Sequence, residues 1–285
     1  MLRLPFKPVK NLLRKISPRA LRNWARHPGK SRDYLLDRII HACGREAEVQ
    51  FLPDWTVRCH PASRDHFSVF NHDPEQRAEL DAFIRLCCPG MQFLDIGAHY
   101  GLFALAAIRF GSSGARIVCV EASRKAATIL KTNLRANAAE DRVNLINLAM
   151  GATDGTLEML TTGPAGSDYY VSAPAGRSDT ISVPQLSLPT VLLRTNFRPT
   201  HVKIDIEGFE DDVILGAMKT LSELRPIIFL ELHGGYLRAR GRDPKAVLAN
   251  LRACGYRSIE QHGETLTDSQ IQARNFECRL VCRAD

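Results

Sequence analysis

The sequence predicts an α/β fold in which helices cover both faces of a mostly parallel β-sheet. From residue 92 onward, short runs rich in Val, Ile, Leu and Phe alternate with segments whose apolar residues recur at helical spacing. The runs are apolar along their whole length, as in parallel strands that are buried on both faces. Two further runs at the end of the chain have no long helical segment between them, which predicts an antiparallel pair at one edge.

These patterns predict a seven-stranded sheet. Ser123 is a suitable N-cap for the second helix, since its side-chain oxygen can accept a hydrogen bond from the first turn. The predicted strands span 93–96, 116–121, 142–149, 201–206, 226–232, 256–260 and 276–282, and the predicted helices span 102–110, 123–137, 209–222 and 244–253.

Two other regions depart from this alternation. Residues 48–90 predict a small β/α element, with strands over 48–52, 55–59 and 66–70 and a helix that starts at Asp73 and runs to about residue 88. Residues 151–200 contain β-like pieces at 156–160, 168–172 and 180–186 and a short helical run at 188–196. A structureless loop of this length is unusual in a compact domain, so we expect an inserted hairpin or arm that covers the substrate. The expected organisation is therefore a leader (1–47), the β/α element (48–90) and a main domain (91–285).

Charge is distributed unevenly along the 285 residues. Residues 1–30 hold nine Lys/Arg and no acid, whereas the rest of the chain has 38 − 9 = 29 basic against 31 acidic residues. Apolar residues at helical spacing within this leader predict two short basic helices in peripheral contact with an anionic membrane surface. A solvated arm, a nucleic-acid contact and a targeting segment are the alternatives. No apolar stretch approaches the roughly 18 residues of a membrane span.

The eight cysteines include no C-x-x-C pair, so the spacing typical of zinc sites is absent. Cys119 lies inside an apolar run, where a reduced thiol behaves as a small buried hydrophobe. We expect a reducing, cytoplasmic environment.

The strand at 93–96 ends in a glycine turn that predicts a cofactor site. Gly97 and Gly101 let a ligand approach the backbone at the start of the next helix. Asp95 would repel a pyrophosphate, and the middle glycine of a dinucleotide motif is missing, which disfavours an NAD-dependent oxidoreductase. A carboxylate suits S-adenosylmethionine, which carries an ammonium and a sulfonium, and Glu121 ends the next strand where an acid can bind ribose hydroxyls. The predicted cofactor-binding residues are Asp95, Gly97, Ala98, His99, Gly101, Glu121, Ala122 and Ala149.

Acidic side chains and a histidine follow two later strands. Asp205 and Glu207 alternate with apolar residues after Lys203, and His233 follows the strand at 226–232. Carboxyl ends of parallel strands are where open α/β sheets bind ligands, so we predict Asp205, Glu207 and His233 as catalytic residues. Asp205 or His233 would be the general base, and Glu207 would orient the acceptor. A structural Lys203–Asp205 ion pair is the alternative; no metal is required, although paired acids can hold a hard divalent ion.

Four segments together resemble one family. FLDIGAHYGLFAL, VCVEASRKAATILKTNLRAN, VKIDIEGFEDDVILGA and RPIIFLELHG, in this order, resemble the FkbM-type methyltransferases over roughly residues 65–285. The resemblance implies a Rossmann-like class I fold and S-adenosylmethionine as cofactor. The most specific motif is K-I-D-x-E-G-x-E at 203–210. Two positions depart from the family pattern: His99 stands where Asn is usual, and Ser187-Leu188-Pro189 stands where a Leu-Asp pair is common.

The resemblance implies O-methylation of a hydroxyl on a sugar, glycolipid or secondary metabolite, so the expected partner is a small-molecule or glycan acceptor. An RNA methyltransferase that uses the basic leader is one alternative, although the acidic body and the lack of interleaved aromatic and basic residues disfavour nucleic acid. A non-catalytic binding module on the same fold is the other alternative.

Overall fold

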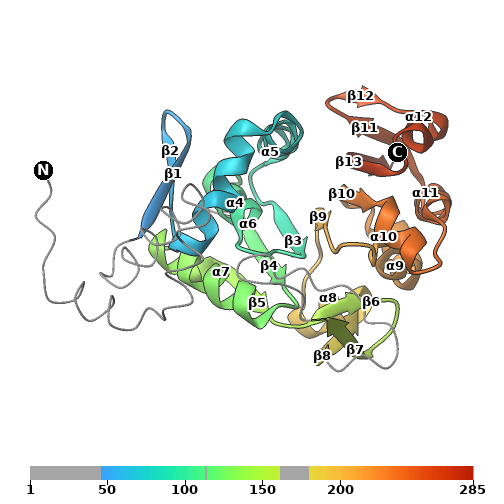
Figure 1. The fold of residues 1–285 in the computed structure, drawn as a ribbon, viewed down its shortest axis with the longest axis horizontal. Helices are drawn as coiled ribbons and strands as arrows, with labels where there is room; N and C mark the ends of the chain where they lie inside the picture. Colours follow the sequence, from blue (N-terminus) through green and yellow to red (C-terminus); the bar gives the residue numbers. More distant parts are fainter. Residues whose placement is uncertain (1–45, 113, 161–179, 285) are drawn as a thin grey trace, which may run out of the picture. The chain divides into compact units, whose positions relative to one another are not determined.

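A computed structural model of the chain describes residues 46–112, 114–160 and 180–284 (Figure 1). Residues 1–45 of the predicted leader, its membrane contact and the predicted strand at 168–172 lie outside these residues, whereas Ala47 belongs to the first strand of the structure. The chain divides into two compact units, Met1–Val69 and Phe70–Asp285. The domain boundaries expected at residues 47 and 90 remain predictions.

The first unit contains a β-hairpin, as its sequence predicts. Strand β1 (Ala47–Leu52) pairs antiparallel with β2 (Trp55–Cys59), and Val49 lies opposite Val57. Buried and exposed residues alternate along both strands, so one face of the hairpin is apolar. The ring centroids of Phe51 and Trp55 lie 4.8 Å apart on this face.

The prediction of a strand over 66–70 is wrong, because these residues belong to helix α4 (Pro61–His72). Ser63, Phe67 and Phe70 are the buried residues of the segment, at the spacing of one helical face. Val69, which would share a face with Phe67 in a strand, is exposed. Pro61 lies at the first helical position and His60 Nδ1 accepts a hydrogen bond from Ala62 N at 3.1 Å, so the helix start was also present in the sequence.

The second unit is built on an eight-stranded sheet in the order β12-β11-β13-β10-β9-β3-β4-β5 (Figure 1). Strands β10, β9, β3, β4 and β5 are parallel, whereas β13, β11 and β12 pair antiparallel at one edge. The predicted α/β fold and its antiparallel edge are thus confirmed, although the short strand β12 adds an eighth strand to the seven that the sequence predicts. The strand bounds are β3 (Gln92–Ile96), β4 (Arg116–Val120), β5 (Val143–Ile146), β9 (His201–Ile204), β10 (Ile227–His233), β11 (Tyr256–Gln261), β12 (Glu264–Thr265) and β13 (Glu277–Ala284).

Helices connect the strands close to where the sequence predicts them. Ser123 caps α7, where its side chain accepts a hydrogen bond from Ala126 N at 3.1 Å, and Asp73 caps α5 in the same way. The segment between β11 and β13 is longer than a turn and contains the short strand β12 and the helix α12. The helices are α5 (Pro74–Leu86), α6 (Leu102–Phe110), α7 (Arg124–Ala136), the 3-10 helix η1 (Glu140–Arg142), α8 (Leu188–Thr195), α9 (Glu210–Leu224), α10 (Gly234–Ala239), α11 (Pro244–Ala253) and α12 (Asp268–Ala273).

The predicted strand over 142–149 is two strands that belong to different sheets. Strand β5 ends at Ile146, and β6 (Ala149–Gly151) joins a three-stranded sheet in the order β6-β8-β7. Between them, Asn147 Nδ2 donates to Glu121 O at 2.7 Å and to Ala122 O at 3.1 Å, which turns the chain out of the main sheet. The small sheet also contains β7 (Gly155–Leu160) and β8 (Thr180–Ser187), which form the predicted inserted hairpin.

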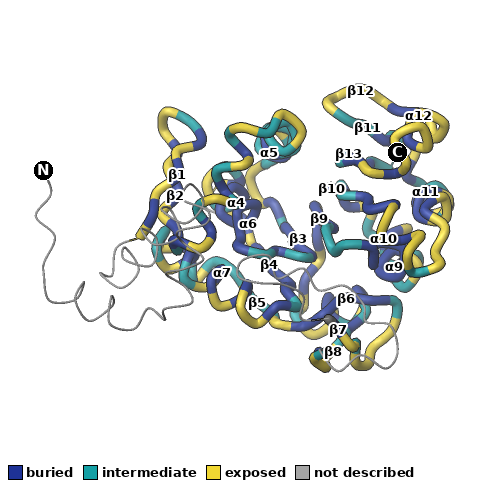
Figure 2. Tube along the Cα trace, in the orientation of Figure 1, coloured by how far each residue is buried: buried dark blue, intermediate teal, exposed yellow. Residues whose placement is uncertain are grey.

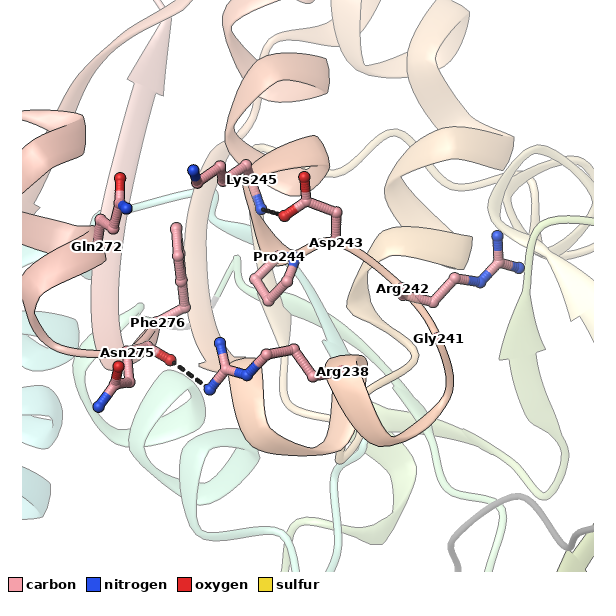
Figure 3. A pocket seen from close by; sticks show the side chains of 9 residues that line it. All are labelled: Arg238, Gly241, Arg242, Asp243, Pro244, Lys245, Gln272, Asn275 and Phe276. Carbon is pink, nitrogen blue, oxygen red and sulfur yellow. Dashed lines mark hydrogen bonds between the residues drawn. The ribbon is translucent and has the colours of Figure 1, made fainter.

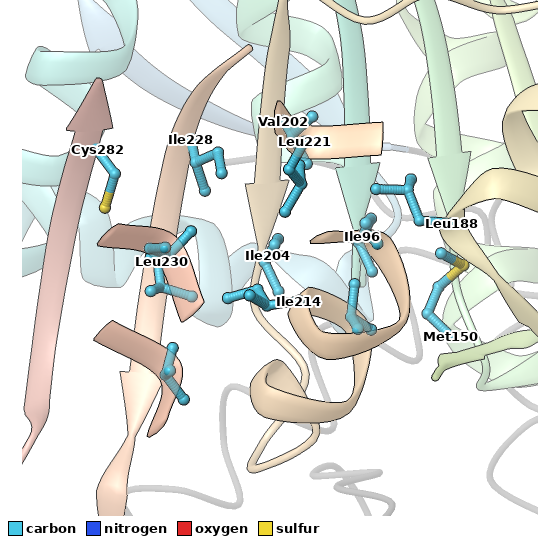
Figure 4. Packing of buried hydrophobic residues seen from close by; sticks show 14 of the residues in the cluster. Ile96, Met150, Leu188, Val202, Ile204, Ile214, Leu221, Ile228, Leu230 and Cys282 are labelled. Atoms are coloured by element: carbon cyan, nitrogen blue, oxygen red, sulfur yellow. The ribbon is translucent and has the colours of Figure 1, made fainter. Parts of the chain in front are cut away.

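The two faces of the main sheet differ in chemistry. One face is apolar: Ile96, Val202, Ile204, Ile228 and Leu230 pack against α8, α9 and α11 in a single buried cluster (Figures 2 and 4). Burial of this kind contributes about 25 cal/mol per Å² of apolar surface, so this face stabilises the second unit.

The opposite face combines aromatic and charged residues. The Phe83 ring of α5 lies 4.8 Å from the Phe93 ring and 5.0 Å from the Phe229 ring. Strand register places Asp95 beside Lys203 and Lys203 beside Phe229 on this face. Charged side chains thus stand on a buried sheet, where they need partners.

In the described part of the chain, no helix is both long and apolar enough to cross a membrane.

Candidate functional site

The glycine turn after β3 has the close-packed backbone that its sequence predicts. Gly97 has φ +83 and Gly101 has φ +85, a region in which side chains are strained. Gly97 N donates to Val120 O at 2.9 Å, and Asp205 N donates to Ile96 O at 3.0 Å. A Cβ atom on Gly97 would lie 1.8 Å from the backbone oxygen of Asp205. The turn and the end of β9 are therefore in direct contact.

His99 lies in the left-handed region, with φ +46. Asn and His are among the residues that tolerate this conformation best, which explains why His can stand where the family usually has Asn. His99 N donates to Glu121 Oε2 at 2.7 Å, so the backbone at this position links the turn to the end of β4.

We expect His99→Asn to retain the stability of the protein and His99→Ile to lower the free energy of unfolding by about 1–3 kcal/mol, the range for a β-branched residue in a strained backbone region. Urea denaturation measures both variants. Equal stabilities for His99→Ile and the parent protein would contradict this interpretation of the turn.

Glu121 is buried at the end of β4 and organises the backbone around it. Its Oε1 accepts a hydrogen bond from Ser123 N at 2.7 Å, while its Oε2 accepts the bond from His99 N. Burial raises the pKa of Glu121 to about 7, although these backbone donors oppose the shift. Ala122 packs against a small cluster of residues from the β6-β8-β7 sheet that includes Ala149, so these two predicted residues lie close together.

Asp95 is only 1% exposed. Among the described residues, its Oδ2 atom has no hydrogen-bond partner. Burial raises the pKa of Asp95 to about 7, with Lys203 opposing the shift. An unpartnered buried carboxylate oxygen is costly and requires an explanation, such as a ligand that supplies a donor or a positive charge.

The acids after β9 and β10 come together next to the glycine turn. Lys203 Nζ lies 2.7 Å from Asp205 Oδ2, so the ion pair considered from the sequence is present. Burial disfavours the charge on Asp205, but Lys203 and His233 hold the pKa of this carboxyl below its usual range. Glu207 has φ +52, an uncommon conformation for a non-glycine residue and one that concentrates at functional sites.

His233 contacts three carboxylates. Its Nδ1 lies 2.8 Å from Glu210 Oε1, and its Nε2 lies 3.6 Å from Glu207 Oε2 and 3.7 Å from Glu231 Oε1. Burial alone would lower the pKa of His233, but the hydrogen bond that its Nδ1 donates to Glu210 and the nearby carboxylates raise it to about 9. His233 is therefore protonated at neutral pH and carries a positive charge.

Sequence reasoning missed Glu231 and Glu210. Glu231 lies two residues before His233 on β10, so the two side chains share a face, and this period of two was visible in the run FLELH. Burial, Asp205 and Glu79 raise the pKa of Glu231 to about 8. Glu210 ends the motif at 203–210, but its contact with His233 depends on the fold.

One group of side chains has the spacing of a metal site. The ligand atoms of Asp205, Glu231 and His233 all lie within 4.8 Å of one another. However, Lys203 already pairs with Asp205, and Arg279 NH2 donates to Glu231 Oε1. These cations already occupy carboxylate oxygens that would bind an ion, so we assign no metal to this group.

The raised pKa values predict that stability falls as pH rises. Asp95, Glu121, Glu231 and His233 have folded pKa values of about 7, 7, 8 and 9, against ordinary values of 3.8, 4.5, 4.5 and 6.5. The folded protein therefore binds more protons than the unfolded chain across this window. The contribution of His233 is complete below pH 6.5 and is lost as pH rises through about 9. We expect urea denaturation to give a smaller free energy of unfolding at pH 9 than at about pH 6. A larger value at pH 9 would contradict these assignments, and Glu231→Gln should flatten the slope.

A surface pocket of about 510 Å³ lies elsewhere in the second unit, and none of the predicted site residues lines it (Figure 3). Its lining residues are Arg238, Gly241, Arg242, Asp243, Pro244, Lys245, Gln272, Asn275 and Phe276. Arg242 pairs with Asp212, and Arg238 donates to Asn275 O at 3.2 Å, so two of its cations are already engaged.

Comparison with known proteins places this chain among methyltransferases. The model of the methyltransferase FkbM domain matches residues 95–258, which are 164 of the 285 residues. One similar solved structure is methyltransferase FkbM from Methylobacillus flagellatus KT, with 16% identity, a TM-score of 0.45, and coverage of 78% of this chain and 54% of that chain. This chain thus spans about half the length of that protein.

Two further similar structures were solved with a ligand. One is an O-methyltransferase from Bacillus cereus in complex with SAH, with 15% identity, a TM-score of 0.42, and coverage of 79% of this chain and 88% of that chain. The other is Aeropyrum pernix fibrillarin with S-adenosyl-L-methionine, with 10% identity, a TM-score of 0.46, and coverage of 84% and 82%. No curated protein matches the sequence.

Proposed function

Because this chain belongs to the FkbM methyltransferase family, we propose that it transfers a methyl group from S-adenosylmethionine to a hydroxyl oxygen of a sugar, glycolipid or secondary metabolite. The observation that carries the proposal is the contact between the two halves of the site. The backbone oxygen of Asp205 occupies the space that a Cβ atom on Gly97 would fill, so the acids after β9 adjoin the glycine turn.

The residues of the turn fit S-adenosylmethionine. Glycines at 97 and 101 let the turn pack closely against the rest of the protein, since a Cβ atom at either position would lie within 3.0 Å of an atom of Asp205 or Leu130. Glu121 retains acceptor capacity on both carboxylate oxygens, because each holds one backbone hydrogen bond and can take a ribose hydroxyl as well. The unpartnered Oδ2 of Asp95, close to the turn, is free to accept a hydrogen bond from the cofactor. When bound, the cofactor supplies an electrophilic methyl group on a positively charged sulfur.

The chemistry requires an acceptor oxygen, a base and a place for the released proton. As the acceptor oxygen bonds to the methyl carbon, the carbon–sulfur bond breaks, sulfur keeps the electron pair, and the hydroxyl proton passes to a base of the protein. Asp205 is the favoured base, since its pKa is lowered and it stays ionised at neutral pH, whereas the pKa values of Glu231 and His233 are raised to about 8 and 9. His233 already carries a proton and stabilises negative charge instead. Glu207 orients the acceptor next to His233.

Positioning is the larger part of the proposed mechanism. A free alcohol is a much weaker acid than a carboxyl group, so Asp205 must take the proton during attack rather than before it. This requires an oxygen of Asp205 within about 2.6–3.2 Å of the reacting hydroxyl. Effective alignment of the acceptor and the methyl donor then supplies much of the rate enhancement.

Metal removal is expected to leave turnover unchanged. Lys203 and Arg279 already bind Asp205 and Glu231, so no divalent ion is needed to hold these carboxylates together. The measurement is the initial rate before and after dialysis against EDTA. A loss of activity that Mg²⁺ or Mn²⁺ restores would show that the acids hold a metal instead.

The function is tested by incubating the full chain with S-adenosylmethionine and a panel of polyhydroxylated acceptors. We expect S-adenosylhomocysteine to form with at least one saccharide or hydroxylated metabolite. A protein that binds S-adenosylmethionine but forms no S-adenosylhomocysteine with any acceptor would support the non-catalytic alternative.

A further inference from the structure

A chain of buried and half-buried charged side chains connects the acids Asp205 and Glu231 of the site to a helix and a strand outside the family-matched segment. Lys203 Nζ lies 2.7 Å from Asp205 Oδ2 and 3.5 Å from Glu79 Oε1. The second oxygen of Glu79 accepts a hydrogen bond from Arg279 Nε at 3.0 Å, and Arg279 NH2 donates to Glu231. We call these five residues, Asp205, Lys203, Glu79, Arg279 and Glu231, the charge chain.

Glu79 is the centre of the charge chain. Its side chain is 7% exposed, and each of its two oxygens holds one cation. Lys203 and Arg279 in turn each hold one acid of the site, and those two acids have ligand atoms within 4.8 Å of each other. The ends of the charge chain therefore meet beside the predicted acceptor site.

Packing fixes Glu79 in place. Phe83 is one helical turn after Glu79 on α5, so both side chains face the sheet. The Phe83 ring contacts Phe93 on β3 and Phe229 on β10. These two strands flank β9, which carries Lys203, and β10 also carries Glu231. Lys203 Nζ also lies 4.7 Å from the centre of the Phe103 ring, which limits its movement.

From this geometry, we propose that Glu79 and Arg279 are positioning residues that hold the carboxyl groups of Asp205 and Glu231 at the reacting hydroxyl. The inference rests on the proposed function. Neither residue lies within the family-matched segment at 95–258. Without Glu79, Lys203 and Arg279 lose the carboxylate that both of them bind. Asp205 and Glu231 are then no longer held in place through one shared residue.

A purely structural role makes a different prediction. A structural ion network would affect the free energy of unfolding, and it would leave the kcat of the remaining folded protein unchanged. A positioning role lowers kcat while cofactor affinity stays constant, because the misplaced groups act in the transition state and not in cofactor binding. A displacement of about 1 Å can reduce the rate by up to about 10²-fold.

The test compares Glu79→Gln with Glu75→Gln, a matched variant one turn earlier on the same helix. Glu75 is exposed and pairs with His262 Nε2 at 3.0 Å at the surface. We expect Glu79→Gln to lower kcat by about 10- to 10²-fold with an unchanged dissociation constant for S-adenosylhomocysteine. Glu75→Gln should keep the parent kcat. A folded Glu79→Gln protein with the parent kcat, or an equal loss in Glu75→Gln, would overturn the inference.

Arg279→Lys provides a second variant that keeps the positive charge but loses the planar guanidinium, whose Nε binds Glu79 and whose NH2 binds Glu231. We expect a reduced kcat for this variant, and for the double variant with Glu79→Gln a loss smaller than the product of the single losses, because both act on one unit. If Glu79→Gln does not fold, the parent kcat in Arg279→Lys overturns the inference.

Failure of the proposed function is distinguishable from failure of this inference. If the parent protein methylates no hydroxyl acceptor, the proposed function fails on its own. Crystal structures of the parent and Arg279→Lys proteins then decide the inference: displaced carboxyl groups at Asp205 and Glu231 support it, and unchanged positions overturn it.

Discussion

Asp205→Asn is expected to lower kcat by about 10²–10⁴-fold, the usual contribution of a positioned general base. The substitution keeps the shape of the side chain and removes its charge, so the reacting hydroxyl loses its proton acceptor. Lys203 retains Glu79 at 3.5 Å as a counter-ion, which limits the cost in stability. Steady-state kinetics on a verified acceptor measure kcat, and calorimetry with S-adenosylhomocysteine should show a nearly constant affinity.

The matched control is Asp81→Asn, which removes a carboxylate from the surface ion pair with Arg77. Exposed pairs of this kind contribute about 0–1 kcal/mol to stability, so the control variant should have the parent kcat and nearly the parent stability. Parent turnover in Asp205→Asn would show that this residue is structural, and the base would then have to be sought in the insertion at 151–200.

Gly97→Ala is expected to abolish cofactor binding and to destabilise the protein. The added methyl group would lie 1.8 Å from Asp205 O, a distance that requires the turn or the end of β9 to move. A left-handed backbone conformation adds about 1–2 kcal/mol for a residue with a side chain. Calorimetry with S-adenosylmethionine and urea denaturation measure the two effects.

Gly90→Ala separates the steric clash expected at Gly97 from the cost of a side chain in a left-handed backbone conformation. Gly90 has φ +77, similar to Gly97, but a Cβ atom there would meet no atom within 4 Å. This variant should lose only the conformational contribution and keep the affinity of the parent protein. Equal losses of affinity in both variants would contradict the contact between the turn and β9 as the cause.

Local patterns predicted those parts of the fold that local interactions determine. Ser123 and Asp73 begin their helices as expected, and the glycine turn after β3 has the positive φ values that its residues require. The helix at 61–72 was missed because the run HFSVF has strand propensity, while the spacing of Ser63, Phe67 and Phe70 is helical. Tertiary burial determined which pattern prevailed.

The candidate site was predictable only in part, because local sequence patterns do not specify contacts between residues that are far apart in the chain. Asp205 and His233 lie at strand ends, where sequence periodicity points. Glu79 and Arg279 are 124 and 48 residues distant from Lys203 and Glu231 in the chain, respectively (203 − 79 and 279 − 231). Their contacts depend on the order of the strands and on the packing of α5, which no local pattern in the sequence specifies. The raised pKa of His233 likewise depends on its contacts with Glu210 and the other carboxylates, which outweigh the opposing effect of burial.

The most direct test of the central claim is the position of a transferred methyl group. The full chain is incubated with S-adenosylmethionine labelled with ¹³C at the methyl carbon and with an acceptor that yields S-adenosylhomocysteine, and the product is analysed by NMR. Our account predicts a labelled methyl group bonded to a former hydroxyl oxygen, with the signal lost in Asp205→Asn. A labelled methyl group on nitrogen or carbon, or undiminished O-methylation by Asp205→Asn, would contradict it.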